Sequence, residues 1–208
     1  MPQILRVDAR DPDAALIARA AEMVRAGLVV AYPTDTLYGL AVDPRNATAV
    51  RRLFELKGRA ETSALTLIAA DVAQAREAAD MTAAAERLAA RWWPGPLTIV
   101  IGAGPGLAAE TLAGGRTVGV RVPDHPVAVA LARLAGFCVT ATSANRSGGT
   151  AAVTPDAVSE ALPGVDAILD AGAAPGGAPS TIVDASTRDV TLIRAGVVPW
   201  DRVLRSLE

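Results

Sequence analysis

The sequence contains one cysteine, one histidine and one lysine among its 208 residues. Because Cys138 is alone, no disulfide can form within the chain and a cysteine-based zinc site is disfavoured, which fits a reducing cytoplasm. A single histidine, His125, leaves too little for a histidine metal centre or a Ser/His triad. No apolar run approaches the length of a membrane span, and no signal-peptide segment precedes Arg6. We therefore expect a cytoplasmic protein without a membrane-spanning part and without a set of metal-ligating residues.

The charge balance is close to neutral, since 20 lysines and arginines oppose 22 aspartates and glutamates, and the pI is near 5.5. This is far from the basic excess of a dedicated nucleic-acid binder, although it leaves room for a local basic groove. The length and the 51% hydrophobic content suit one well-filled core. We expect a single domain over residues 1–208.

The spacing of apolar residues predicts alternating helices and strands, the pattern of an α/β protein. One helix is expected to begin at residues 11–13 and end at Gly27, another to begin at Thr154, and others to cover residues 46–57, 71–79, 82–92, 126–134 and 200–207. Strands are expected over residues 28–32, 65–69, 97–101, 117–122, 138–142, 167–169, 180–183 and 190–194. Two of these strands end in clusters of small polar side chains, and strand ends are where open α/β sheets bind ligands.

The first cluster is Thr34, Asp35 and Thr36, directly after the strand 28–32. Pro33 stops the strand because it lacks an N–H and fixes φ. The hydroxyl and carboxylate groups that follow favour a tight turn at the strand's end. An alternative is that Asp35 caps a short helix that runs through Tyr38 and ends at Gly39.

The second cluster is Ser143-Ala144-Asn145, which follows the strand 138–142 and leads into Gly148 and Gly149. Small hydrogen-bonding groups in a glycine-containing loop are an arrangement that holds phosphate or ribose oxygens. The loop matches neither a P-loop nor a dinucleotide-binding fingerprint.

Lys57 stands at the end of the helix 46–57, on its apolar side, seven residues after Val50. The other 19 basic residues (20 − 1) are arginines, so a retained lysine indicates a need for a compact ammonium group. The alternative is that Lys57 snorkels to solvent or neutralises the carbonyl groups at its own helix end.

The strand 117–122 alternates strictly, with valines on one face and Thr117, Gly119 and Arg121 on the other. The valine face belongs to the core. A glycine between a hydroxyl and a guanidinium suits a bound anion, because glycine in a strand often marks close approach of a ligand to the backbone. The alternative is an exposed strand face with a surface arginine.

Together these segments resemble the YrdC-like L-threonylcarbamoyladenylate synthase family in its short, single-domain form. The resemblance runs from about residue 10 to the end of the chain, and several independent motifs carry it: 33–40 (PTDTLYGL), 57–59 (KGR), 93–98 (WPGPLT), 120–123 (VRVP), 143–145 (SAN), 179–181 (PST) and 194–196 (RAG). It implies a twisted open mixed sheet with flanking helices and a concave, positively lined groove. It also implies synthesis of threonylcarbamoyl-AMP and pyrophosphate from L-threonine, bicarbonate and ATP, with Mg²⁺ accompanying the ATP.

The resemblance further implies residue roles and partners. A downstream threonylcarbamoyl transferase would use the product to modify adenosine 37 of tRNA, and direct tRNA binding would be weak at most. The implied catalytic set is Lys57, Arg59, Ser143 and Asn145; the implied threonine-binding set is Thr34, Arg121 and Ser180; the implied ATP-binding set is Lys57, Arg59, Thr117, Ser143 and Arg194.

The sequence departs from the family pattern after Arg59, where residues 60–65 read AETSAL in place of a proline and a later basic or amide residue. It also ends soon after Arg194, so the linker and second domain of longer members are not expected. Two other functions are compatible with such a fold. A module that binds double-stranded RNA or tRNA without catalysis would use the same groove, and a hydrogenase-maturation module would normally be part of a larger chain with zinc-finger motifs.

Overall fold

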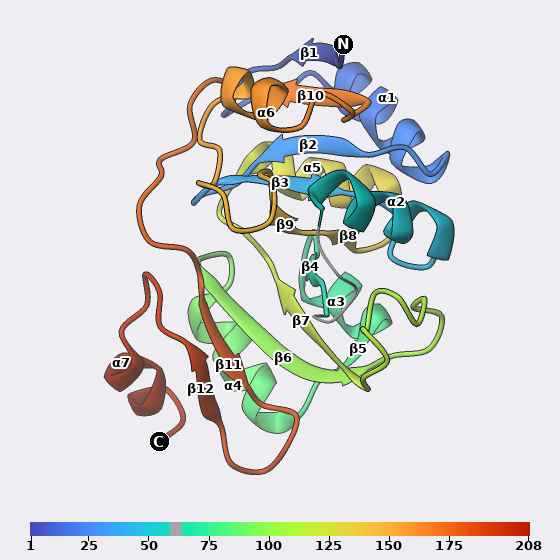
Figure 1. Cartoon of the computed structure of the whole chain (residues 1–208). Coiled ribbons are helices and arrows are strands. Elements are labelled where there is room, and N and C mark those ends of the chain that lie inside the picture. Colours follow the sequence, from blue (N-terminus) through green and yellow to red (C-terminus); the bar gives the residue numbers. More distant parts are fainter. Residues whose placement is uncertain (59–63) are drawn as a thin grey trace.

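The computed structural model describes residues 1–58 and 64–208 and has an α/β architecture built on two open mixed sheets (Figure 1). The predicted α/β class with an open mixed sheet is confirmed, and the strands are divided between two such sheets instead of one. Among the described residues, none of the helices has both the length and the apolar character that a membrane crossing requires.

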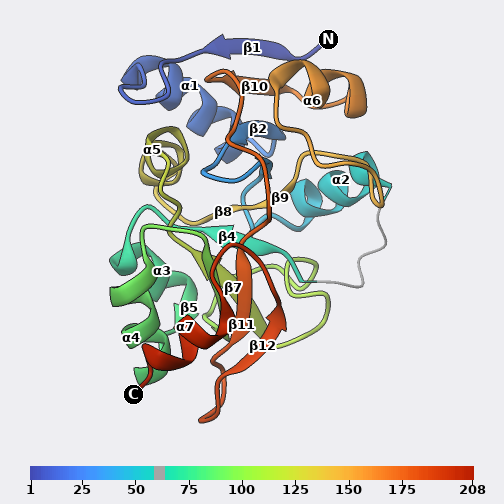
Figure 2. The ribbon, with the colours of Figure 1, turned by 90° about the vertical axis from the view of Figure 1, so that its left-hand side faces the viewer.

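The five-stranded sheet is enclosed by helices on both faces. Its strand order is β1 (Gln3–Arg6), β10 (Ala167–Asp170), β2 (Val30–Pro33), β3 (Tyr38–Ala41) and β9 (Thr142–Ser143). The first three strands run parallel, and β3 is antiparallel to both of its neighbours. One face packs on α1 (Ala14–Arg25) and α5 (Pro126–Ala135), the other on α2 (Ala47–Lys57) and α6 (Pro155–Ala161) (Figure 2). Burial on both faces explains why β2 reads as a continuous apolar run.

The seven-stranded sheet has one face covered by a layer of helices (Figure 2). Its strands are β12 (Thr191–Arg194), β11 (Thr181–Asp184), β6 (Leu97–Ala103), β7 (Thr117–Arg121), β4 (Thr66–Ile68) and β8 (Val139–Thr140), with β5 (Ala79–Asp80) pairing with β6. The covering helices are α3 (Val72–Ala78), α4 (Ala83–Trp92) and α7 (Trp200–Arg205). The alternate side chains of β6 and β7, including the predicted valine face, pack against this helical layer.

The predicted strand 138–142 is split, and its two halves join the two sheets. β8 pairs with β4 of the seven-stranded sheet, and β9 pairs with β3 of the five-stranded sheet. Between them, Ala141 N donates to Thr66 O at 2.7 Å. The fully buried Thr140 side chain donates to Leu40 O and accepts from Val42 N, both at 2.9 Å. One chain segment therefore holds the edges of both sheets at a fixed separation.

Local sequence signals account for most of the helix ends. The side chains of Asp13 and Asn46 accept hydrogen bonds from backbone N–H groups at the starts of α1 and α2. Gly58 ends α2 with a φ of +60°. The alternative helix through Tyr38 is wrong, because that residue begins strand β3. Thr34 Oγ1 accepts from the N–H groups of Thr36 and Leu37 at 3.2 Å, which closes a turn and returns the chain antiparallel to β2. Strands β1, β3 and β5 were not predicted from the sequence.

We predict that Thr140→Val lowers the free energy of unfolding by about 2–4 kcal/mol, because the N–H of Val42 and the C=O of Leu40 lose their partner in a buried place. The matched control is Thr111→Val, a fully buried threonine whose hydroxyl makes one bond, to Pro44 O at 2.7 Å. It should cost about 1 kcal/mol. Urea denaturation followed by circular dichroism measures the free energy of unfolding of both variants. An equal loss in the two would contradict the role of Thr140 in holding the two sheets together.

Candidate active site

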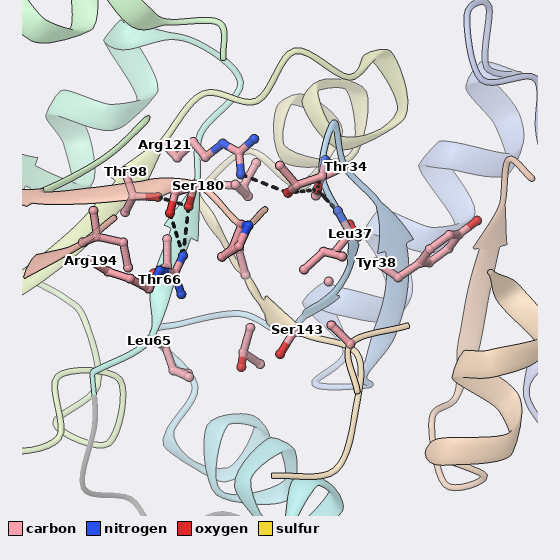
Figure 3. Close-up of a pocket in the computed structure, with 18 of the residues that line it drawn as sticks. Thr34, Leu37, Tyr38, Leu65, Thr66, Thr98, Arg121, Ser143, Ser180 and Arg194 are labelled. Atoms are coloured by element: carbon pink, nitrogen blue, oxygen red, sulfur yellow. Dashed lines mark hydrogen bonds between the residues drawn. The ribbon is translucent and has the colours of Figure 1, made fainter. Parts of the chain in front are cut away.

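A cavity of about 720 Å³ lies where the face of the seven-stranded sheet opposite its helical layer meets the edge of the five-stranded sheet (Figure 3). Strands of both sheets line it, together with residues 150–153 and the segment that leads from β10 to β11. Its volume falls within the range of small-molecule sites. Its lining includes five of the residues implied by the resemblance: Thr34, Arg121, Ser143, Ser180 and Arg194.

Thr34 contributes to the cavity through a turn that uses its own hydroxyl group. Thr34 Oγ1 donates to Leu37 O at 2.7 Å and lies 3.1 Å from Thr36 Oγ1. The hydroxyl is therefore engaged in the turn, and the turn fixes the wall that Thr34, Thr36 and Leu37 present to the cavity (Figure 3).

Among the described residues, two guanidinium groups line the cavity, and both come from strands of the seven-stranded sheet. Arg121 ends β7, and Arg194 ends β12 and donates to Ser180 O at 2.8 Å. Burial, reinforced by the positive charge of Arg121, lowers the pKa of Arg194 from its usual value. Two cations that disfavour one another in a partly buried cavity are a suitable receptor for an anionic ligand.

Ser180 connects Arg194 with a threonine of the neighbouring strand. Its hydroxyl lies 2.9 Å from Thr98 Oγ1 and 3.3 Å from Arg194 Nη2 (Figure 3). Gly196 packs closely against this segment. A Cβ added to Gly196 would lie only 2.2 Å from Pro179 O. The glycine of the RAG segment therefore permits the close approach that positions Ser180.

Lys57 and Asn145 stabilise the loop behind Ser143. The ammonium group of Lys57 donates to Ser143 O and, at 2.8 Å, to Asn145 O. The Asn145 amide donates to Arg146 O and Gly149 O at 2.7 Å, and within the described ranges its buried Oδ1 has no partner. The alternative that Lys57 snorkels to solvent is wrong, because the residue is only 3% exposed. It reaches the carbonyl groups of the second polar cluster.

Two described residues, Thr117 and His125, stand apart from this arrangement. Thr117 begins β7, at the other end of the strand from Arg121, and is not among the described residues that line the cavity. Arg59 lies outside the described residues. His125 precedes α5 and does not line the cavity either; burial lowers its pKa, against the opposing effect of the nearby Asp35 and Asp124 carboxylates.

Sequence reasoning missed several polar residues that line the cavity, chiefly Thr66, Thr98 and Tyr38. Thr66 is paired in register with Gly119, and an added Cβ on that glycine would lie 3.1 Å from the Thr98 side chain. The unusual glycine in the strand 117–122 was therefore the available signal for these neighbours. Burial raises the pKa of Tyr38 to about 12, so its hydroxyl stays protonated and donates to Gly172 O at 2.7 Å.

Comparison with known proteins identifies the family. The model of the Sua5/YciO/YrdC family, described as "Telomere recombination", matches residues 22–196. The chain belongs to the Sua5/YciO/YrdC family. Among curated members, the threonylcarbamoyl-AMP synthase of Bacillus subtilis is 36% identical over 90% of this chain and 55% of its own length. That of Vibrio vulnificus is 38% identical over 86% of this chain and 98% of its own length.

A solved structure of a Sua5/YciO/YrdC family member has the same fold. Pyrococcus abyssi Sua5, crystallised in complex with L-threonine, superposes with a TM-score of 0.92 at 34% identity, over 98% of this chain and 60% of that protein. The chain thus spans 55% of the length of the Bacillus subtilis relative and nearly the whole length of the Vibrio vulnificus relative.

We predict that Lys57→Met reduces turnover by at least about tenfold and lowers the free energy of unfolding by about 2–4 kcal/mol, because two carbonyl groups lose a charged donor. Lys57→Arg should not restore activity, since a planar fork cannot replace a compact ammonium in this space.

Arg52→Met is the control on the same helix. Arg52 is 40% exposed and pairs with Asp166, so its loss should cost less than about 1 kcal/mol and leave turnover unchanged. Thermal unfolding measures the stability of the three variants, and an activity assay measures their turnover. Normal turnover in Lys57→Met would mean that the lysine has a purely structural role.

Proposed function

We propose that this protein is a threonylcarbamoyl-AMP synthase, which forms threonylcarbamoyl-AMP and pyrophosphate from L-threonine, bicarbonate and ATP. The observation that carries the proposal is the inter-sheet cavity, which brings Arg121, Ser180, Arg194 and Ser143 together from strands far apart in sequence. Support comes from relatives of that name at 36–38% identity, and from a relative whose crystal structure holds L-threonine.

The cavity suits the electrostatic demands of this reaction. The amine of threonine and bicarbonate condense to a carbamate with loss of water. An oxygen of the carbamate attacks the α-phosphorus of ATP, and the bond from that phosphorus to the pyrophosphate oxygen breaks. The carbamate itself is the nucleophile, so the protein has to position the reactants and offset their negative charges.

In this proposal Arg121 and Arg194 serve different substrates. Arg121 would pair with the threonine carboxylate, and Thr34 and Ser180 would shape the amino-acid subsite. Arg194 and Ser143 would face ATP together with Arg59, and Thr117, which lies outside the cavity lining, would meet only a part of ATP that extends beyond the cavity. Lys57 and Asn145 would contribute to the reaction at minimum by holding the backbone of the loop that follows Ser143.

Magnesium would enter this site on the phosphates of ATP, where it offsets charge on the leaving pyrophosphate. The described part of the chain contains no group of three or more His, Cys, Asp or Glu side chains placed to hold a metal ion. The described residues that line the cavity carry hydroxyl and guanidinium groups and no carboxylate. The ion therefore belongs to the nucleotide substrate in this proposal, and no protein ligand is assigned to it.

The product would pass to a threonylcarbamoyl transferase that acts on tRNA. We expect direct tRNA contact to be weak and salt-sensitive, because the formal net charge of the chain is −2. A noncatalytic RNA-binding module is the alternative that this cavity supports less well, since a partly buried site of small hydroxyl groups suits small anions better than a duplex.

The test is pyrophosphate release with each substrate omitted in turn. We expect release to require L-threonine, bicarbonate and ATP together, and the product to be threonylcarbamoyl-AMP by mass spectrometry. Release without threonine would indicate a plain ATP pyrophosphohydrolase. Tight, salt-resistant tRNA binding with no pyrophosphate release would favour the noncatalytic alternative.

A further inference from the structure

Arg121 lines the cavity, yet the protein itself already uses several of its donors. Its Nε donates to Gly95 O at 2.9 Å, its Nη1 to Thr36 Oγ1 at 3.4 Å, and its Nη2 to the carboxylate of Asp35. A guanidinium carries more N–H groups than these three contacts use. The donors that remain are the ones that a ligand in the cavity can engage.

Asp35 reaches Arg121 from outside the cavity. The residues on either side of it in the turn, Thr34 and Thr36, line the cavity, and Asp35 does not. Figure 3 shows Arg121 beside the turn that carries Thr34. The Arg121 side chain is 6% exposed and that of Asp35 is 14% exposed, so the two charges meet with little solvent around them.

This geometry fixes the plane of the guanidinium before any ligand arrives. Gly95 O holds the Nε end, and Asp35 holds the Nη2 end. A free arginine side chain has many rotamers, and ordering it on binding would cost affinity. Asp35 also offsets a nearly buried positive charge, which would be costly to leave alone.

We propose that Asp35 is a positioning residue for the amino-acid substrate: it holds Arg121 from behind so that the remaining N–H groups of the guanidinium meet the substrate α-carboxylate. This inference rests on the proposed function, because it takes an amino acid as the ligand of Arg121. Asp35 itself does not touch the substrate. Its effect is therefore specific to ligands that carry an α-carboxylate and is absent for ATP.

The test compares Asp35→Asn, which keeps the size of the side chain and removes its charge, with the wild type. We expect the KM for L-threonine to rise by at least about tenfold, while the KM for ATP changes by less than about twofold, since only the carboxylate contact is misaligned. Asp43→Asn is the matched control. Asp43 is also a carboxylate with little exposure, paired with an arginine, Arg45, at 2.8 Å, but Arg45 does not line the cavity as Arg121 does, so this variant should change neither KM.

A second readout uses L-threoninamide, which lacks the carboxylate. In the wild type, calorimetry should show L-threonine binding much more tightly than L-threoninamide. In Asp35→Asn, that difference should shrink by at least about tenfold, because the arginine no longer presents a fixed fork. A structural defect alone would weaken both ligands and leave their ratio unchanged.

The outcomes separate this inference from the proposed function. An unchanged threonine-to-threoninamide ratio, or tighter threonine binding in Asp35→Asn, would overturn the role of Asp35. If the wild type binds threonine but releases no pyrophosphate, the proposed function fails, and the binding ratio still decides the inference. Should Asp35→Asn not fold, Asp35→Glu keeps the charge at a longer reach; it should raise the threonine KM by about threefold or more and leave the ATP KM unchanged, and wild-type values for both would overturn the proposal.

Discussion

The hydrogen bonds around Thr140 and Ala141 are the constraint on which the rest of this structure depends. At this point one strand leaves the seven-stranded sheet and enters the five-stranded sheet. The Thr140 side chain bonds the backbone of β3, Tyr32 donates to Thr140 O at 2.9 Å, and Ala141 N donates to β4. These contacts hold the two sheets together at this position, and the cavity lies beside it.

A cavity between two sheets differs from one at the end of a single sheet, because its opposing walls are built independently. The seven-stranded sheet supplies Arg121, Thr98 and Arg194, and the hairpin and loop of the five-stranded sheet supply Thr34 and Ser143. The positive charges of the buried Arg121 and the exposed Arg194 repel one another, and they are tolerable because the seven-stranded sheet holds them at fixed positions. The same fixed positions preorganise the site for anionic reactants.

Helix positions and most strands follow from local signals such as Asn46 before α2 and Gly58 after it. The two-sheet division does not, because it depends on Thr140 and Ala141 bonding to β3 and β4, which lie far away in sequence. Five residues implied by the resemblance, among them Arg121 and Ser143, do line the cavity. Their roles come from the resemblance and stay predictions. Thr66 escaped prediction because nothing in its own strand marks it, and the engagement of Lys57 with the Ser143 loop is a tertiary contact.

In the proposed function, one inter-sheet cavity holds the amino acid and the nucleotide together. A crystal structure with L-threonine and a non-hydrolysable ATP analogue tests this most directly. We expect both ligands in this cavity, with the threonine carboxylate on the free N–H groups of Arg121 and the Arg121–Asp35 pair retained. Threonine bound elsewhere, or a carboxylate that has displaced Asp35 from Arg121, would contradict it.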